Sequence, residues 1–495
     1  MPFTHNLPFL CIFLAMAAAI FLSVVKKPRL CWNITFFVAS ASALMSIIFL
    51  ASIVSEDSAF AYTMGKFPAP FGNEIKAGPL QALFAACFSL VTVLALLGGK
   101  KDLFEDVDEK KMGLTCVMLN MVLASLLVLT YTNDVFTAYV FIEISTIAAC
   151  ALVMAKDSGE TLVATIRYLF MSLLGSGLFL LSLFILYGIT GHLLMPQLSQ
   201  SVTELLSFGS YHLPILICAA AMAAGLGIKS AMFPFHRWLP DAHGSATTCS
   251  SAVLSGLVLK GYAVLMITLF VRIFSLDFIR SSGIGAVIFL FGLMGMIGGS
   301  VRAIGETHAK RMLAYSSVAQ MGYVFMGIGL CSEAGIAAAC YQILAHAFAK
   351  PLLFSCVGKL SAVSGHDKQL SSLRGSAWSC PLAGVGFGAA ALSMIGIPLF
   401  AGFNAKLFLA SASMGSAGTI LTLSVLGLSS VLNAVYYLPA LIALWNPIGL
   451  EKRSCSHAPD PAFAAGAVLL ILGIFVLGIF FGPVITIIIR GLQLM

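Results

Sequence analysis

The hydrophobic and polar positions of this chain alternate on a long period, with extended apolar runs separated by short polar ones. A run of about 20 apolar residues can cross the hydrocarbon core of a membrane as one helix. We expect fourteen such spans, at residues 7–25, 33–53, 80–98, 112–131, 135–155, 164–189, 212–233, 247–271, 283–301, 312–331, 334–357, 383–409, 417–444 and 462–488. No long linker interrupts them, so the pattern predicts an all-α integral membrane protein with a single polytopic domain over residues 1–495.

Composition agrees with this fold class. The chain is 60% hydrophobic and 9% charged, with a mean hydropathy of +1.01, whereas a soluble domain has about 25% charged residues. The net charge of +7 is not gathered in one stripe, and we therefore expect no nucleic-acid partner.

The distribution of lysine and arginine tests the span count. Eighteen of the 27 lie in alternate loops beginning after the first span, five lie in the other loops, and four lie inside spans. Cytoplasmic loops carry the excess of basic residues, so we expect both termini on the non-cytoplasmic side of the cell membrane. The longest polar stretch, residues 102–111, mixes both signs and is expected to be a solvated cytoplasmic loop.

A few ionisable residues lie inside the expected spans. Glu143 is the one acid well inside a span, and the buried bases are Lys229, Lys260, Lys350 and Lys406. Each charge at the bilayer centre costs about 2.5–3.5 kcal/mol even on lenient insertion scales. These side chains should therefore face the bundle interior, a partner or water, although Lys350 and Lys406 are also candidates for snorkelling to the headgroups.

Buried carboxylates and lysines suit proton transfer. Desolvation and a nearby opposite charge shift their pKa values in opposite directions, so a coupled Glu/Lys pair can bind and release a proton in turn. The sequence leaves open whether Glu143 contacts Lys229. His236, His243 and His346 titrate near physiological pH and are candidates either for secondary relays or for hydrogen-bonded packing residues.

Two spans carry helix-breaking residues. Span 212–233 runs into Pro234 and Pro240, and span 383–409 contains Pro398 between two glycines. Proline removes a backbone donor and clashes with the preceding turn, and in a membrane such breaks persist only where protein or a water-filled cavity satisfies the freed groups. The pattern is typical of an inverted-repeat transporter, and a simple proline kink at each position is the alternative.

Four segments carry a family resemblance. They are Lys229-Ser-Ala-Met-Phe-Pro-Phe-His-Arg-Trp-Leu-Pro-Asp-Ala-His243, Lys310-Arg-Met-Leu-Ala-Tyr-Ser-Ser-Val-Ala-Gln-Met-Gly-Tyr323, His346-Ala-Phe-Ala-Lys-Pro-Leu-Leu-Phe354 and Phe67-Pro-Ala-Pro-Phe-Gly72. The first three resemble the antiporter-like subunits of respiratory complex I, membrane-bound hydrogenases and Mrp cation/proton antiporters. The fourth, with the compact length, looks most like the D-type Mrp subunit and its hydrogenase relatives. Two segments depart from the family pattern: Ser245-Ala-Thr-Thr-Cys-Ser250 replaces a proline-containing segment, and Pro351 follows Lys350 where a small residue is usual.

The resemblance implies a particular architecture. Helices 4–8 (residues 112–271) and 9–13 (residues 283–444) would form two inverted five-helix repeats, with helices 7 and 12 discontinuous.

It also implies roles along a polar axis. Glu143 would be the helix 5 glutamate and Lys229 its helix 7 partner, Lys260 the central relay on helix 8, and Lys406 the helix 12 residue of the exit. His346 and Lys350 would link the two halves.

Three functions compete at this stage. The first is a proton-translocating subunit of a multisubunit complex, either a redox-driven pump or an Mrp-type Na⁺/H⁺ antiporter. The second is a membrane scaffold that has lost transport, and the third is a stand-alone secondary transporter. The chain has no phosphate-binding loop and no C-x-x-C pair among its twelve cysteines, so we expect no cofactor, metal or catalytic site of its own. Any redox reaction would belong to partner hydrogenase or iron–sulfur subunits.

Overall fold

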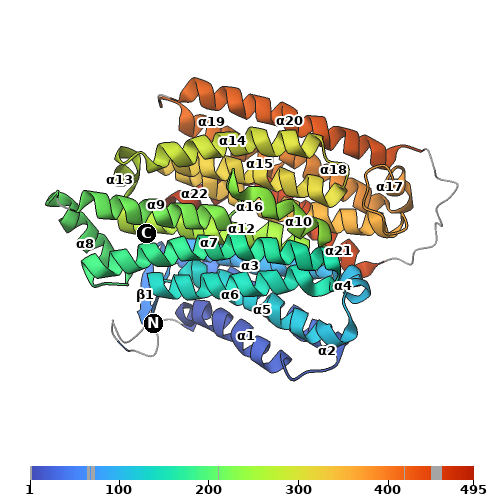
Figure 1. Ribbon diagram of the computed structural model, residues 1–495. Helices are drawn as coiled ribbons and strands as arrows, with labels where there is room; N and C mark the ends of the chain where they lie inside the picture. Colours follow the sequence, from blue (N-terminus) through green and yellow to red (C-terminus); the bar gives the residue numbers. More distant parts are fainter. Residues whose placement is uncertain (1–2, 64–66, 68–72, 210, 417, 448–459) are drawn as a thin grey trace.

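The computed structural model describes residues 3–63, 67, 73–209, 211–416, 418–447 and 460–495, and it is almost entirely helical. The long helices lie side by side in one bundle (Figure 1). Those that coincide with the expected spans are α1 (Leu7–Leu22), α2 (Pro28–Glu56), α3 (Pro79–Gly98), α5 (Glu109–Tyr131), α6 (Val135–Val153), α7 (Gly159–Thr190), α9 (His212–Lys229), the continuous run α11 (Thr248–Val253), η5 (Leu254–Val258), α12 (Leu259–Leu269) and η6 (Phe270–Phe274), then α14 (Ile284–Ile304), α15 (Ala309–Gly329), α16 (Glu333–Ala362), α18 (Pro381–Ile395) with α19 (Ala401–Ser413), α20 (Thr419–Trp445), and α21 (Pro461–Ile479) with α22 (Phe481–Gln493).

Within the described residues, twelve helices are long and apolar enough to cross a membrane. The expected spans that fall short are those of α15, which begins with two basic residues, and of the broken pair α18–α19. An all-α membrane fold is therefore confirmed, while fourteen crossings stay a prediction.

Shorter elements join the spans or cover their ends. They are η1 (Phe3–Asn6), β1 (Phe60–Thr63), β2 (Glu74–Ala77), α4 (Lys100–Asp106), η3 (Met154–Lys156), α8 (Met195–Ser207), η4 (Phe235–Arg237), α10 (Trp238–Ser245), α13 (Leu276–Ser281) and α17 (Ser376–Ser379). The antiparallel pair β1–β2, with Phe60 opposite Ala77, is the exception to an all-helical chain. Of the segment Phe67–Gly72, residues 68–72 lie outside the described residues.

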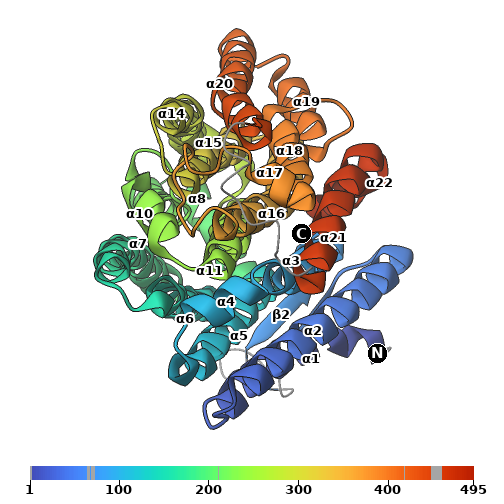
Figure 2. The same ribbon diagram turned by 90° about the vertical axis from the view of Figure 1, so that its right-hand side faces the viewer.

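Helix α16 is the centre of the bundle. It packs against α3, α11, α15, α18, α19 and α21, and it lies among these helices when the bundle is viewed end-on (Figure 2). Every residue of this helix from Gly335 to Ser361 is buried. This helix carries His346 and Lys350, so both side chains lie in the protein interior and neither snorkels.

Polar contacts at the two ends of the bundle agree with the loop assignment. Arg490 near the C-terminus pairs with Asp57 at 2.6 Å, and the neighbouring Glu56 bonds His5 at 2.9 Å. Both termini therefore lie at one end, beside α8 and α13 (Figure 1). At the opposite end, Lys156 pairs with Asp106 at 2.8 Å. Each pair joins residues that the loop count placed on one side.

Two expectations about local structure are wrong. The span 462–488 is not one helix, since α21 ends at Ile479 and α22 begins at Phe481. Pro483 has no N–H to donate to the Ile479 carbonyl, and its ring clashes with that carbonyl in a continuous helix. The stretch 102–111 is not a solvated loop throughout. Residues 102–106 lie in α4, and Asp102 faces inward against Gly358 of α16.

Candidate functional site

Both predicted helix breaks are present, and each has a lysine beside it. Helix α9 ends at Lys229, and the chain resumes in η4 and α10. Helix α18 ends at Ile395, capped by Gly396 in the left-handed region (φ 93°), and Lys406 reaches back from α19 to donate to the Ile395 carbonyl at 2.7 Å. A helix C-terminus presents unpaired carbonyls and a partial negative charge. The second break thus places the Lys406 ammonium where a helix end is polarised to receive a cation.

The first charged group lies between α6, α9 and α12. Lys229 is 1% exposed and donates to Thr146 Oγ1 at 2.6 Å, while its Nζ lies 5.5 Å from the Tyr262 ring. Glu143, one turn before Thr146, acts electrostatically on Lys229, but the structure records no ion pair within 4.0 Å between these two described residues. Glu143 Oε1 is buried without a protein partner. The two groups share one interior, with Thr146 holding the lysine.

Lys260 occupies the centre and is completely buried. It follows η5, a π-helical turn of a kind that is frequent at functional sites, and it donates to the Ser255 carbonyl. Ser255 Oγ lies 2.8 Å from Ser317 Oγ on α15, and Ser317 donates to the Leu313 carbonyl at 3.0 Å. A chain of hydrogen bonds therefore leads from Lys260 into α15.

The same series of hydrogen bonds reaches Lys350. Its Nζ donates to the same Leu313 carbonyl at 2.8 Å and lies 3.4 Å from the Tyr437 hydroxyl. Tyr437 Oη is 2.7 Å from Ser316 Oγ, and its ring packs on Tyr436 at 4.6 Å between centroids. Lys350 thus connects the centre of the bundle to α20.

A second polar cluster surrounds Lys406. Asn433 donates to the Tyr323 hydroxyl at 3.4 Å and accepts from Tyr436 Oη at 2.7 Å. Lys406 Nζ lies 5.1 Å from the Tyr323 ring and donates to Ser430 Oγ at 2.9 Å. Lys406 is therefore held inside the bundle and does not snorkel. Hydrogen bonds and ring contacts together run without a gap from Lys260 to Lys406.

Sequence reasoning missed the contribution of α20. This helix supplies Ser429, Ser430, Asn433, Tyr436 and Tyr437. The pattern is visible in the sequence: Asn433 follows Ser429 by four residues, and Tyr436 and Tyr437 follow Asn433 by three and four. These spacings put the polar side chains on one helix face. None carries a charge, and neutral polar residues are common in membrane helices, so the sequence alone does not mark this helix face as functional.

The three histidines lie near this path with ring nitrogens that bond no protein group. Both ring nitrogens of His243 and His346 and the Nδ1 of His236 are buried and unbonded. His243 stacks on Phe354 with centroids 5.0 Å apart, and His346 acts electrostatically with Lys260 and Lys350. A buried polar atom is almost always bonded to protein or ordered water, so these nitrogens mark places where water is needed.

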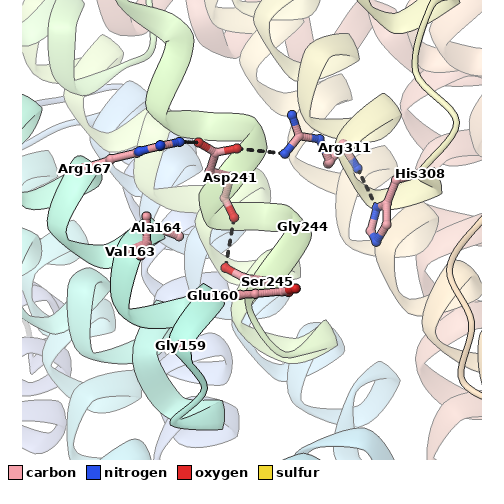
Figure 3. Close-up of a pocket in the computed structure, with 10 residues that line it drawn as sticks. All are labelled: Gly159, Glu160, Val163, Ala164, Arg167, Asp241, Gly244, Ser245, His308 and Arg311. Carbon is pink, nitrogen blue, oxygen red and sulfur yellow. Dashed lines mark hydrogen bonds and ion pairs between the residues drawn. The ribbon is translucent and has the colours of Figure 1, made fainter.

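A pocket of about 490 Å³ opens where α7, α10 and α15 meet, and charged side chains are among its lining residues. Asp241 of α10 lies between two arginines, Arg167 of α7 at 2.5 Å and Arg311 of α15 at 2.8 Å (Figure 3). Arg311 also contacts Glu306 at 3.1 Å. The segment after the first break is thereby clamped to helices on both sides.

Replacing Asp241 with asparagine is expected to loosen this clamp. The pairs are partly exposed, so the loss should be about 1 kcal/mol or less for each. Asp277→Asn is the matched control, since Asp277 is 92% exposed and 3.6 Å from Arg280 within one short helix. We expect the thermal midpoint of the purified protein to fall for Asp241→Asn alone; equal shifts in both variants would contradict the clamp.

Within the described residues no three His, Cys, Asp or Glu side chains gather as a metal site requires.

The chain is similar to known membrane proteins in both sequence and fold. Residues 132–432 match the family described as NADH:quinone oxidoreductase/Mrp antiporter, TM. The chain is 31% identical over 443 residues to NADH-quinone oxidoreductase subunit N of Desulforudis audaxviator, covering 88% of this chain and 85% of that protein. Its fold is similar to a chain of the membrane-bound sulfane sulfur reductase, an archaeal respiratory membrane complex, with a TM-score of 0.88, 23% identity and coverage of 99% and 97%. It is also similar to a chain of the Mrp complex from Dietzia sp. DQ12-45-1b, with a TM-score of 0.86, 23% identity and coverage of 100% and 97%.

Proposed function

This chain belongs to the NADH:quinone oxidoreductase/Mrp antiporter transmembrane family, and on that premise we propose that it carries protons across the membrane. It is an antiporter-like membrane subunit, and the structures it resembles are of multisubunit membrane complexes. The proposed path runs from Glu143 and Lys229, through Lys260, to Lys406.

The observation that carries the proposal is the continuous series of hydrogen bonds and ring contacts that connects Lys260 to Lys406. Lysines inside a membrane bundle are costly unless something uses them. Lys229, Lys260 and Lys350 are buried and Lys406 is partly buried. Lys260, Lys350 and Lys406 lie on or beside this chain of contacts. Lys350 is a link within it, in agreement with its place on the central helix.

Water completes the proposed path on the other side of Lys260. No protein hydrogen bond joins Lys229 to Lys260 among the described residues. The Tyr262 ring, on the same helix as Lys260, lies 5.5 Å from Lys229 Nζ, and its hydroxyl is bonded to Ser145 at 3.1 Å. The unbonded Glu143 Oε1 gives water a partner near Lys229, and the unbonded nitrogens of His243 and His346 give it partners near Lys260. We assign His236, His243 and His346 as secondary relays on that ground.

The two inverted repeats, residues 112–271 and 283–444, are part of the proposal. Their support is the matching position of the breaks, each in the fourth helix of five and each with a lysine beside it: Lys229 is the last residue of α9, and Lys406 donates to the last carbonyl of α18. The segments after the breaks, α10 and α19, lie toward opposite ends of the bundle (Figure 1), as inversion requires.

We propose a respiratory-type complex as the host, because the sequence relative is a subunit of NADH-quinone oxidoreductase. An Mrp-type cation/proton antiporter is the second candidate, because the matching family description includes the Mrp antiporter and the fold is similar to a chain of an Mrp complex. In either case other membrane subunits are the partners, both termini face away from the cytoplasm, and any electron carrier belongs to a partner subunit. The narrower resemblance to the D-type Mrp subunit stays a prediction.

The paired substitution Glu143→Gln with Lys229→Ala separates this proposal from an inactive scaffold. It removes both charges of the first group and leaves α6 and α9 otherwise intact. We expect the assembled complex, reconstituted in sealed vesicles, to lose the proton movement that this chain carries. Proton movement at the wild-type level would support the scaffold; transport by the purified chain alone would instead support a stand-alone transporter.

A further inference from the structure

Helix α4 turns one carboxylate toward the interior. Lys101 and Glu105 are exposed and pair at 3.5 Å, whereas Asp102 faces α16. A methyl group at Gly358 would collide with both Asp102 Oδ2 and Thr248 Oγ1. The glycine therefore leaves just the space in which this carboxylate and this hydroxyl meet.

A buried lysine faces the same position from another helix. Lys310 of α15 is completely buried, donates to the Ala246 carbonyl at 2.7 Å and lies 3.5 Å from Ser251 Oγ. It acts electrostatically with Asp102. The other charged groups around this position are Glu105 and Asp106 of α4, Lys156 of η3 and Lys368 after α16.

A line of buried hydroxyls leads inward from Asp102. Thr248, Ser251 and Ser255 follow one another at spacings of three and four residues, so they lie on one face of the α11–η5 helix. All three are buried. Ser255, the last of the three, is also the residue whose backbone carbonyl accepts a hydrogen bond from Lys260. Hydroxyls both donate and accept, and a row of them can pass a proton.

The electrostatics of Asp102 fit exchange with solvent. Burial raises the pKa of this carboxyl above its usual range, against the hydrogen bond from Thr248 and the charge of Lys310. A carboxyl whose pKa moves toward neutrality is a better proton carrier at physiological pH. Asp241, at the neighbouring pocket, is held instead in ion pairs with two arginines.

We propose that Asp102 is the point at which protons exchange between the solvent at the α4 end of the bundle and the path at Lys260, through Thr248, Ser251 and Ser255. This inference rests on the proposed function. At each step a protonated group donates to the next oxygen and is reprotonated from behind, so no other reactant is needed.

The test compares Asp102→Asn with Glu105→Gln, a carboxylate-to-amide change on the exposed side of the same helix, in the intact reconstituted complex. We expect Asp102→Asn to lower the initial rate of proton movement about tenfold, as one barrier raised by about 1.4 kcal/mol does. Asp102→Glu should restore much of the rate, and Glu105→Gln should leave it unchanged.

Lys260→Ala, measured in parallel, separates the two proposals. A wild-type rate for Asp102→Asn beside an inactive Lys260→Ala would overturn the role of Asp102 and leave the proposed function standing. Wild-type rates for both would overturn the proposed function itself. A loss in Asp102→Asn that Asp102→Glu does not recover would make Asp102 a structural residue and would also overturn the inference.

Discussion

Replacing Lys260 with alanine is expected to stop proton movement through this chain. Lys260 is the buried end of the hydrogen-bonded chain to Lys350, and no other described cation contacts Ser255. A positioned proton carrier contributes on the order of 100-fold or more to a transfer step. The number of protons moved per turnover of the reaction that drives the complex should fall by the share that this chain carries.

Two further variants make this result specific. Lys260→Arg keeps the positive charge, but arginine does not release its proton, so a relay predicts the same loss as for alanine. Lys101→Ala, at an exposed lysine paired with Glu105, should change nothing. Full proton movement in Lys260→Arg would show that the charge alone matters and that Lys260 is not a relay.

Asn433→Leu is expected to have the second largest effect, because it cuts the path beyond Lys350. Asn433 donates to the Met394 carbonyl at 3.2 Å and to Tyr323 Oη, and it accepts from Tyr436 Oη and, at 3.3 Å, from Ser300 Oγ. Leucine satisfies none of these groups. Each buried group left unpaired costs about 1–3 kcal/mol, and the connection from Tyr436 to Tyr323 is lost.

A buried asparagine away from the path controls for simple destabilisation. Asn120 of α5 donates to Thr35 Oγ1 at 2.9 Å and to the Cys116 carbonyl at 2.8 Å. Asn120→Leu should also lower thermal stability, yet the folded complex should still move protons. Tyr436→Phe, which removes a single hydroxyl, tests the path if Asn433→Leu does not assemble. Equal proton movement in the Asn433 and Asn120 variants would remove α20 from the path.

The sequence was sufficient for what depends on local pattern. A lysine inside an apolar run is conspicuous, and prolines with glycines mark a break wherever the chain folds, so the four lysines and both broken helices were predictable. The family segments then ordered these residues along an axis.

What depends on contacts between distant segments was not predictable. Asp102 seemed solvated because its neighbours are charged, and its burial depends on Gly358, more than two hundred residues away. The separation of Glu143 from Lys229, the π-helical turn before Lys260 and the polar face of α20 likewise follow from packing rather than from composition.

The central claim is that one buried path carries protons through this chain in series. The measurement that tests it most directly is the number of protons moved per driving turnover by the intact complex in sealed vesicles, for Lys260→Ala, Asn433→Leu and the double variant. Steps in series predict that both single variants and the double variant reach the same residual value, because substitutions in one path are not additive. A wild-type ratio in either single variant, or a double variant far below both, would contradict the account.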